Sequence, residues 1–258
     1  MEDSKLPLTD HLEELRKRII TCLIAVGIGF VISYFFAEQL FLILAHPLSD
    51  ILPEDNSFIF TGITEGFFTY LKLAFFAGIF LSAPVILHQI WCFVAPGLYN
   101  NEKKYVVPFV MLSTIFFIGG TMFGYFAVFP IAFKFFLGYN TDQIRMLPSI
   151  REYLSFSFKF LLAFGIVFEL PIFVLFLSKL GIVNEQQLRT NRKFVIIAIF
   201  IVAAFLTPPD VISQVLMAVP LLFLYELSII IARVFGKKRV EDEGDEPDGD
   251  DALEEDVD

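Results

Sequence analysis

Long apolar runs alternate with short polar segments along most of the chain. A helix that crosses a bilayer needs about 20 apolar residues, and charged residues are rare inside these runs. Because 56% of the residues are hydrophobic and the mean hydropathy is +0.70, the pattern predicts an all-α integral membrane protein. Its six transmembrane helices are expected at about residues 19–36, 67–93, 106–129, 156–178, 194–206 and 211–232.

Basic residues gather on one side of the predicted spans. The segments before span 1, between spans 2 and 3, between spans 4 and 5 and after span 6 hold fourteen of the 19 Lys and Arg residues, and the segments on the other side hold three. Basic residues that flank spans stay on the cytoplasmic side. We therefore expect both termini inside the cell, and the first loop, 38–66, outside with a short interfacial helix in it.

The sequence predicts three parts. Residues 1–18 are expected to be a cytoplasmic amphipathic segment, because their leucines recur on one helical face, and residues 19–235 a six-helix membrane domain. Residues 236–258 are expected to be a disordered cytoplasmic tail, since residues 241–258 hold twelve of the 29 acidic residues and no basic residue. The net charge of −10 therefore reflects the tail and does not imply a basic partner.

Spans 5 and 6 are predicted to form a short hairpin. The apolar part of span 5, Phe194–Leu206, has 13 residues, about 20 Å of helix against a hydrocarbon core of about 30 Å. Thr207–Asp210 contains two prolines and cannot continue the helix. Either the bilayer is thinner beside this hairpin, or Thr207–Asp210 lies below the outer surface. The alternative is that span 5 begins earlier, in the polar loop near Arg189.

One acidic residue falls near the middle of a predicted span. Glu169 has no Lys or Arg within a helical turn, and a charged group at this depth costs at least about 2.5 kcal/mol. Glu169 is therefore expected to face a cavity, water or a partner, although a carboxyl satisfied inside the fold by Ser, Thr or Tyr is the alternative. Glu226, nearer the inner end of span 6, is expected either to pair with Arg233 or to reach the membrane interface, so a structural role is favoured for it.

Two other carboxylates, Glu14 and Glu102, are predicted to lie on the inner face of the membrane. Carboxylates bind guanidinium groups through paired hydrogen bonds, but spacing alone does not distinguish such a clamp from solvated charges. The sequence has no nucleotide-binding, zinc-protease or serine-hydrolase signature, and three scattered His residues do not suggest a metal site. We expect no enzymatic activity, cofactor or metal.

Five motifs resemble those of a known family. They are His11-Leu-x-Glu14-Leu-Arg16, Ser82-Ala-Pro84, Phe93-x-Ala-Pro96-x-Leu-Tyr99-x-x-Glu102, Phe164-Gly165-x-x-Phe168-Glu169-x-Pro171, and Leu206-Thr207-Pro-Pro-Asp210 with Ser213-Gln214. In this order, over about residues 6–235, they resemble the TatC family, the polytopic core of the twin-arginine protein translocase. The acidic tail lies outside the resemblance.

The resemblance implies a glove-shaped bundle in the bacterial cytoplasmic (inner) membrane. Such a bundle receives folded cargo through the cargo's twin-arginine signal peptide, and export is driven by the proton gradient. The resemblance further implies that Glu14 and Glu102 bind the two arginines, with Arg16 and Phe93 on the same surface.

The resemblance also implies partners. TatA-like and TatB-like single-span subunits are expected near Thr207 and Gln214, in a hetero-oligomeric complex that holds several copies of this chain and contacts membrane lipid. No nucleic acid is expected. Structural roles are implied for Pro47, Pro96 and Asp210.

A function from a different class remains open at this point. Glu169 would suit a proton-coupled transporter of small solutes. Inverted repeats would favour that function, and the sequence shows no repeat between residues 19–129 and 156–232.

Overall fold

The structure, a computed structural model, describes residues 8–51, 58–94, 106–138, 147–207 and 211–236. Within these ranges the chain is helical with short connections, and the β-structure is limited to one isolated bridge between Ile59 and Ser149. The prediction of an all-α membrane protein is confirmed. Five helical segments are long and apolar enough to cross a bilayer: His11–Phe35, Glu65–Phe93, Val107–Leu137, Ile150–Lys179 and Val211–Phe235.

Two long helices, α1 (Leu8–Phe35) and α3 (Glu65–Val94), pack against each other through a pair of glycines. A Cβ atom on Gly29 would lie 2.7 Å from the Gly78 carbonyl oxygen, and one on Gly78 would lie 2.6 Å from a backbone nitrogen of α1. No side chain fits between these backbones. The Ser82 hydroxyl donates a hydrogen bond of 2.7 Å to a carbonyl of α1, which fixes the register of the pair.

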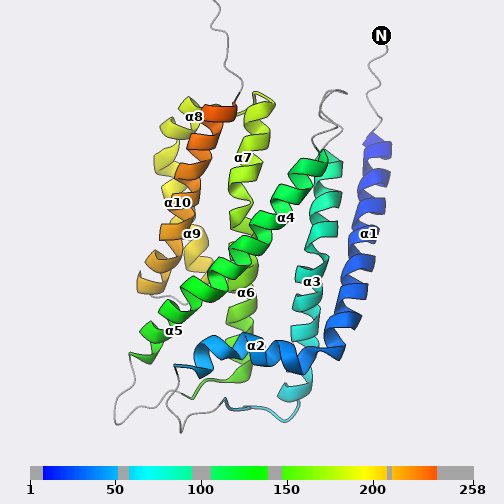
Figure 1. The fold of residues 1–258 in the computed structure, drawn as a ribbon, viewed down its shortest axis with the longest axis vertical. Coiled ribbons are helices and arrows are strands. Elements are labelled where there is room, and N and C mark those ends of the chain that lie inside the picture. The colour runs from blue at the N-terminus through cyan, green and yellow to red at the C-terminus, as the bar shows by residue number, and fades with distance from the viewer. Residues whose placement is uncertain (1–7, 52–57, 95–105, 139–146, 208–210, 237–258) are drawn as a thin grey trace, which may run out of the picture.

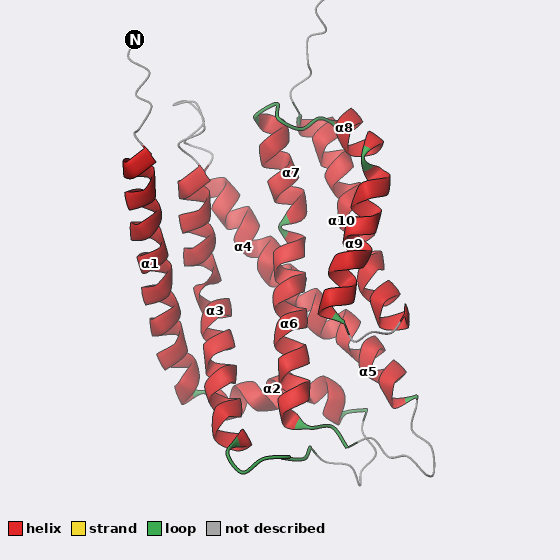
Figure 2. Ribbon diagram, turned by 180° about the vertical axis from the view of Figure 1, so that it is seen from behind, coloured by secondary structure: helices red, strands yellow, loops and turns green. Residues whose placement is uncertain are grey.

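A short helix, α2 (Ala37–Ser49), lies across the end of the bundle opposite the N-terminus (Figures 1 and 2), where a loop helix was predicted. Pro47 is buried inside α2 and has no N–H group, so the Ile43 carbonyl lacks its helical donor. The Tyr125 hydroxyl donates to that carbonyl at 2.5 Å. The Tyr153 hydroxyl donates to the next carbonyl along α2, also at 2.5 Å. Pro47 thus leaves a carbonyl free for the rest of the bundle to bind.

Span 3 is a continuous helical segment made of α4 (Val106–Phe123), the π-helix η3 (Gly124–Val128) and α5 (Phe129–Leu137). This span was expected to end at residue 129, just before Pro130, but the helical segment continues to Leu137, so the predicted end is wrong. Pro130 lies in the first turn of α5, and the π turn before it shifts the hydrogen-bond register so that its missing N–H breaks no helix.

Span 4 consists of α6 (Ile150–Phe168) and α7 (Leu170–Lys179), which are separated at Glu169. Pro171, in the first turn of α7, lacks the N–H that would continue the ladder, and this explains the interruption. The second outer loop, predicted at 131–155, is shorter because helices occupy both of its ends. The centre of the bundle is aromatic, and its buried rings include Phe129, Phe133, Tyr153, Phe158, Phe160 and Phe164.

The last helices form the predicted hairpin. A separate helix, α8 (Glu185–Thr190), ends at Asn191, so span 5 does not run back past Arg189 as one helix. The following helix, α9 (Arg192–Leu206), has 15 residues, about 22 Å. The prediction that span 6 is also short is wrong, because α10 (Val211–Phe235) has 25 residues, about 37 Å. One basic residue in its last turn does not stop this apolar helix.

Candidate functional site

The start of α1 and the end of α3 meet at one end of the bundle (Figure 1). We call this surface the α1–α3 end. The antiparallel packing of the two helices brings together side chains that are about 75 residues apart in the sequence. Its described members are His11, Glu14, Arg18, Gln89 and Phe93. Since α1 is helical from Leu8, most of the predicted amphipathic segment belongs to the same helix as span 1.

Glu14 is partly exposed and pairs with Arg18. The Glu14 Oε1 atom accepts from Arg18 Nε at 3.2 Å and also from a terminal nitrogen of the same guanidinium. Arg18 donates in addition to Gln89 at 3.4 Å, which links the pair to α3. The Glu14 side chain is 29% exposed, and no hydrogen bond among the described residues uses its Oε2 atom. This free oxygen can accept a second cationic donor.

The structure also describes the other two residues predicted for this surface, apart from Glu102. The Phe93 ring stacks on His11, with ring centroids 4.5 Å apart. Arg16 is exposed, and it forms no ion pair with any residue that the structure describes. Glu13 pairs with Lys17 at 2.9 Å on an exposed part of α1.

Three predicted residues lie outside the described ranges. Glu102 and Pro96 belong to the connection between α3 and α4, and Asp210 belongs to the connection between α9 and α10. The two ends of the α3–α4 connection, Val94 and Val106, are both at the α1–α3 end (Figure 1). The structure therefore brings Glu14 and Phe93 to the same end of the bundle, while a shared surface with Arg16 and with Glu102 remains a prediction.

Glu169 lines a groove of about 340 Å³ between α3, α4 and span 4, and the other side chains along it are almost all apolar. The Ser113 hydroxyl lies beside the carboxyl and accepts a hydrogen bond of 2.8 Å from Trp91 Nε1. The Oε1 atom of Glu169 is buried and has no hydrogen-bond partner among the described residues. Such an acceptor costs about 1–3 kcal/mol, so the structure favours the cavity-facing interpretation over a fully satisfied carboxyl.

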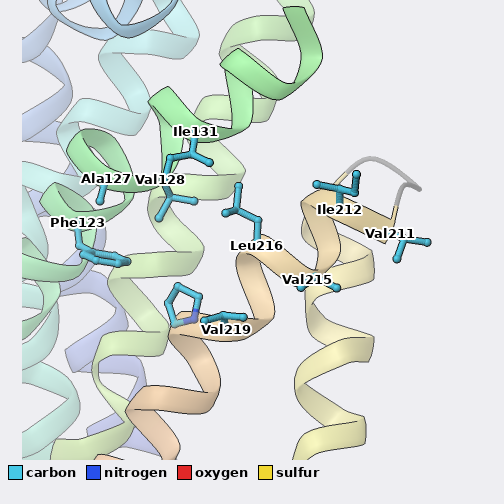
Figure 3. Close-up of a pocket in the computed structure, with 10 residues that line it drawn as sticks. Phe123, Ala127, Val128, Ile131, Val211, Ile212, Val215, Leu216 and Val219 are labelled. Carbon is cyan, nitrogen blue, oxygen red and sulfur yellow. The ribbon is translucent and has the colours of Figure 1, made fainter. Parts of the chain in front are cut away.

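The residues predicted to contact partner subunits form hydrogen bonds within the hairpin. The Thr207 hydroxyl donates to the Ala203 carbonyl, and Gln214 Nε2 donates to the Phe200 carbonyl, each at 2.9 Å. Beside the first half of α10 an apolar groove of about 430 Å³ faces η3 and α5 (Figure 3). It is lined by Phe123, Ala127, Val128, Ile131, Val211, Ile212, Val215, Leu216, Val219 and Pro220.

Glu226 pairs with a different residue from the one predicted. Its carboxylate lies 2.8 Å from Arg192, because the hairpin places the start of α9 beside the last turns of α10. Arg233, the predicted partner, lies two helical turns away and is instead 4.0 Å from Glu185. Both pairs are partly exposed and are therefore worth little energy.

Sequence reasoning missed Glu65, an 8% exposed residue at the start of α3. Its carboxylate accepts from the Thr61 and Gly62 backbones at 2.5 and 2.9 Å and from the Thr61 hydroxyl at 2.9 Å. It also accepts from the Ser149 hydroxyl at 3.2 Å and the Arg151 backbone at 3.1 Å. The available signal was a Glu in the first turn of an apolar helix, where a carboxylate is favoured. The donors from Ser149 and Arg151 are more than 80 residues away in the sequence, and no local sequence pattern predicts them.

The fold and this arrangement agree with the comparisons to known proteins. A sequence profile of the family described as Sec-independent protein translocase protein (TatC) matches residues 10–220. Proteins with that description from Desulforapulum autotrophicum, Carboxydothermus hydrogenoformans and Escherichia coli K12 are 52%, 45% and 40% identical to this chain. The alignments cover 94%, 92% and 94% of this chain and 90%, 97% and 94% of those proteins.

Two solved structures are also similar. Both are crystal structures described as the twin arginine translocase receptor TatC, one of them in DDM, with TM-scores of 0.78 and 0.79 and 42% sequence identity. They cover 86% of this chain, and this chain covers 98% and 99% of them. Of the two functional classes open from the sequence, protein translocation is confirmed. The chain is a multi-pass membrane component of a non-enzymatic protein translocase, and it belongs to the TatC family.

Proposed function

We propose that this chain is the receptor subunit that binds twin-arginine signal peptides, and that the binding surface is the α1–α3 end. The observation that carries the proposal is the Glu14 carboxylate, which is held by Arg18 through one oxygen and keeps the other open. In this proposal Glu14 and Glu102 each bind one arginine of the peptide. Phe93 and Arg16 border the two arginine positions.

The geometry supports such an exchangeable site. A guanidinium presents two parallel N–H groups to a carboxylate, and sheltered charge-assisted bonds of this kind are worth about 1.5–3 kcal/mol each. Arg18 orients Glu14, and Gln89 orients Arg18, so the carboxylate is placed before the peptide arrives. The apolar part of the signal peptide would supply further affinity along the bundle.

The experiment is a double-mutant cycle between Glu14 and the two peptide arginines, measured as peptide affinity for the full chain in detergent. Glu14→Ala is expected to weaken binding about tenfold, or about 1.4 kcal/mol. Its effect should be much smaller on a peptide whose arginines are lysines, because Lys cannot form the paired bonds. Glu13→Ala is the matched control, since Glu13 is adjacent but pairs with exposed Lys17. Zero coupling for both Glu14 and Glu102 would refute the clamp.

We further propose six spans with both termini in the bacterial cytoplasm, α9 being the short fifth span. The start of α1 and the end of α10 lie at the same end of the bundle (Figure 1), as an even number of crossings requires, and the distribution of basic residues supports that end as the inner one. Residues 1–18 and 236–258 would be cytoplasmic, and the predicted acidic tail lies outside the described residues after residue 236.

Single cysteines test this topology in a chain without Cys22 and Cys92. Cysteine at exposed Asn191 should react with an impermeant maleimide only after the cells are opened, whereas cysteine at exposed Ile63 should react in intact cells. Labelling of the Asn191 site from outside would overturn the proposed orientation.

For the partners, we propose that TatA-like and TatB-like subunits contact the α9–α10 hairpin near Thr207 and Gln214. Support comes from α9, whose exposed apolar residues Phe194, Ile197, Ile201 and Phe205 recur along one face.

We also propose that proton-gradient-driven export needs Glu169. Glu169→Ala is expected to reduce export strongly without lowering the unfolding midpoint, because it removes a buried, unpaired oxygen. Glu169→Gln should be milder. Normal export by both variants would contradict a functional role.

A further inference from the structure

A second polar site lies at the end of the bundle where α2 is found, far from the α1–α3 end. A pocket of about 340 Å³ opens between the first two turns of α3 and the first turn of α6. It differs from the other grooves of the bundle because polar and charged side chains form much of its wall. The lining residues are Thr61, Gly62, Thr64, Glu65, Phe68, Thr69, Lys72, Arg151 and Leu154.

The pocket contains two cations. Lys72, from α3, and Arg151, from α6, are both exposed, and neither forms an ion pair with any described residue. The one acidic residue in the wall, Glu65, leaves a net positive charge, because two cations face one carboxylate, and its two oxygens already accept five hydrogen bonds from other groups. Its bond to the Arg151 backbone fixes the start of α6, and so it holds the Arg151 side chain at the pocket.

The pocket also lies at a defined depth. Lys72 is seven residues into α3, about 10 Å along the axis from the start of the helix, and its long side chain can extend back toward the aqueous surface. Phe68, one turn before Lys72 on the same helical face, is 51% exposed and gives the pocket an apolar side. Polar donors at the mouth and apolar surface beside them are the pattern expected at the level of lipid headgroups.

We propose that this pocket binds the phosphate of a membrane phospholipid. Lys72 and Arg151 bind the phosphate oxygens, with Arg151 able to donate two parallel hydrogen bonds, and the Thr61 and Thr64 hydroxyls bind the rest of the headgroup. The acyl chains lie along Phe68 outside the bundle. An anionic lipid such as phosphatidylglycerol is favoured, because the two cations outweigh the single carboxylate.

The test measures binding of dioleoylphosphatidylglycerol to the full chain in detergent by native mass spectrometry, together with the rise in unfolding temperature that the lipid causes. In the double variant Lys72→Gln with Arg151→Gln, the first lipid should bind about tenfold more weakly and the thermal stabilisation should disappear. Both residues are exposed, so the variant should fold.

The matched control is Lys134→Gln with Lys159→Gln, which removes the same charge from exposed positions outside the pocket. It should bind the lipid within about twofold of the parent chain. Equal binding by both double variants would overturn the proposal, as would equally strong binding of dioleoylglycerol, which has no phosphate. Displacement of the lipid by 10 mM inorganic phosphate would identify a site for free anions and would also overturn the lipid assignment.

Discussion

The two ends of the bundle are held by different kinds of contact. At the α2 end, the Glu65 carboxylate is buried under five donors, and two tyrosine hydroxyls bind backbone carbonyls of α2. At the α1–α3 end, the contacts include the Glu14–Arg18 ion pair, the hydrogen bond from Arg18 to Gln89 and the stack of His11 on Phe93, all between partly exposed or exposed side chains.

This difference distinguishes contacts that hold the fold together from contacts that a ligand can replace. A contact to a buried backbone group cannot be exchanged without leaving that group unsatisfied, which costs about 1–3 kcal/mol. An ion pair between exposed side chains is worth only about 0–1 kcal/mol, so a ligand that brings its own charges can replace it. The Glu65 and tyrosine contacts of the α2 end therefore hold the fold together, whereas the ion pair of the α1–α3 end can be exchanged for a charged ligand.

The largest effect on stability is expected from Glu65→Ala. It leaves five donors without an acceptor and should lower the midpoint of thermal unfolding in detergent by about 5–10 °C. Fluorescence of the single tryptophan reports the transition. The control is Glu152→Ala, which removes an exposed carboxylate from the first turn of α6. It should change the midpoint little. Equal unfolding midpoints for Glu65→Ala and Glu152→Ala would show that the Glu65 contacts do not stabilise the α2 end more than an exposed carboxylate does.

An intermediate effect is expected from the bond between Tyr125 and the carbonyl that Pro47 leaves free. Tyr125→Phe should cost about 1 kcal/mol of unfolding free energy. In a Pro47→Ala background the restored N–H can donate to the Ile43 carbonyl, so the same change should cost less. The coupling energy from this cycle checks the explanation. If Tyr125→Phe costs the same in both backgrounds, the hydroxyl does not act through that carbonyl.

The smallest effect on stability is expected from the ion pair at the other end. Glu14→Ala and Arg18→Ala should each change the unfolding free energy by no more than about 0.5 kcal/mol, even though Glu14→Ala weakens binding of a twin-arginine peptide. Stability and peptide affinity, measured on the same preparations, sharpen the contrast. A loss of stability as large as that of Glu65→Ala would show that Glu14 is scaffold.

Much of the fold follows from local pattern. Apolar length predicted the spans, and the prolines after Leu206 predicted the end of α9. Two helix ends were not predictable from the pattern. Pro130 looked like a helix end because the π turn that accommodates it has no sequence signature, and α10 proved longer than expected because its last basic residue does not stop a helix.

The site shows the same division. Motif order brought Glu14 of α1 and Phe93 of α3 to the same end of the bundle, since antiparallel spans bring their ends together, and a shared binding surface with Arg16 remains a prediction. The partners of single charges were harder to predict. Glu226 pairs with Arg192 rather than Arg233, and the donors to Glu65 come from a loop and from α6, because chain folding and not spacing decides which groups meet. Glu102 remains a prediction.

The length of α9 also limits how this chain can change in evolution. The helix is bounded by the break at Asn191 and by Thr207, so an inserted residue cannot be absorbed at either end. Each added residue turns all that follows by about 100° and lengthens the helix by 1.5 Å. One insertion would therefore rotate Phe205 away from the face it shares with Phe194. Insertions in α9 should therefore persist only near multiples of a full turn.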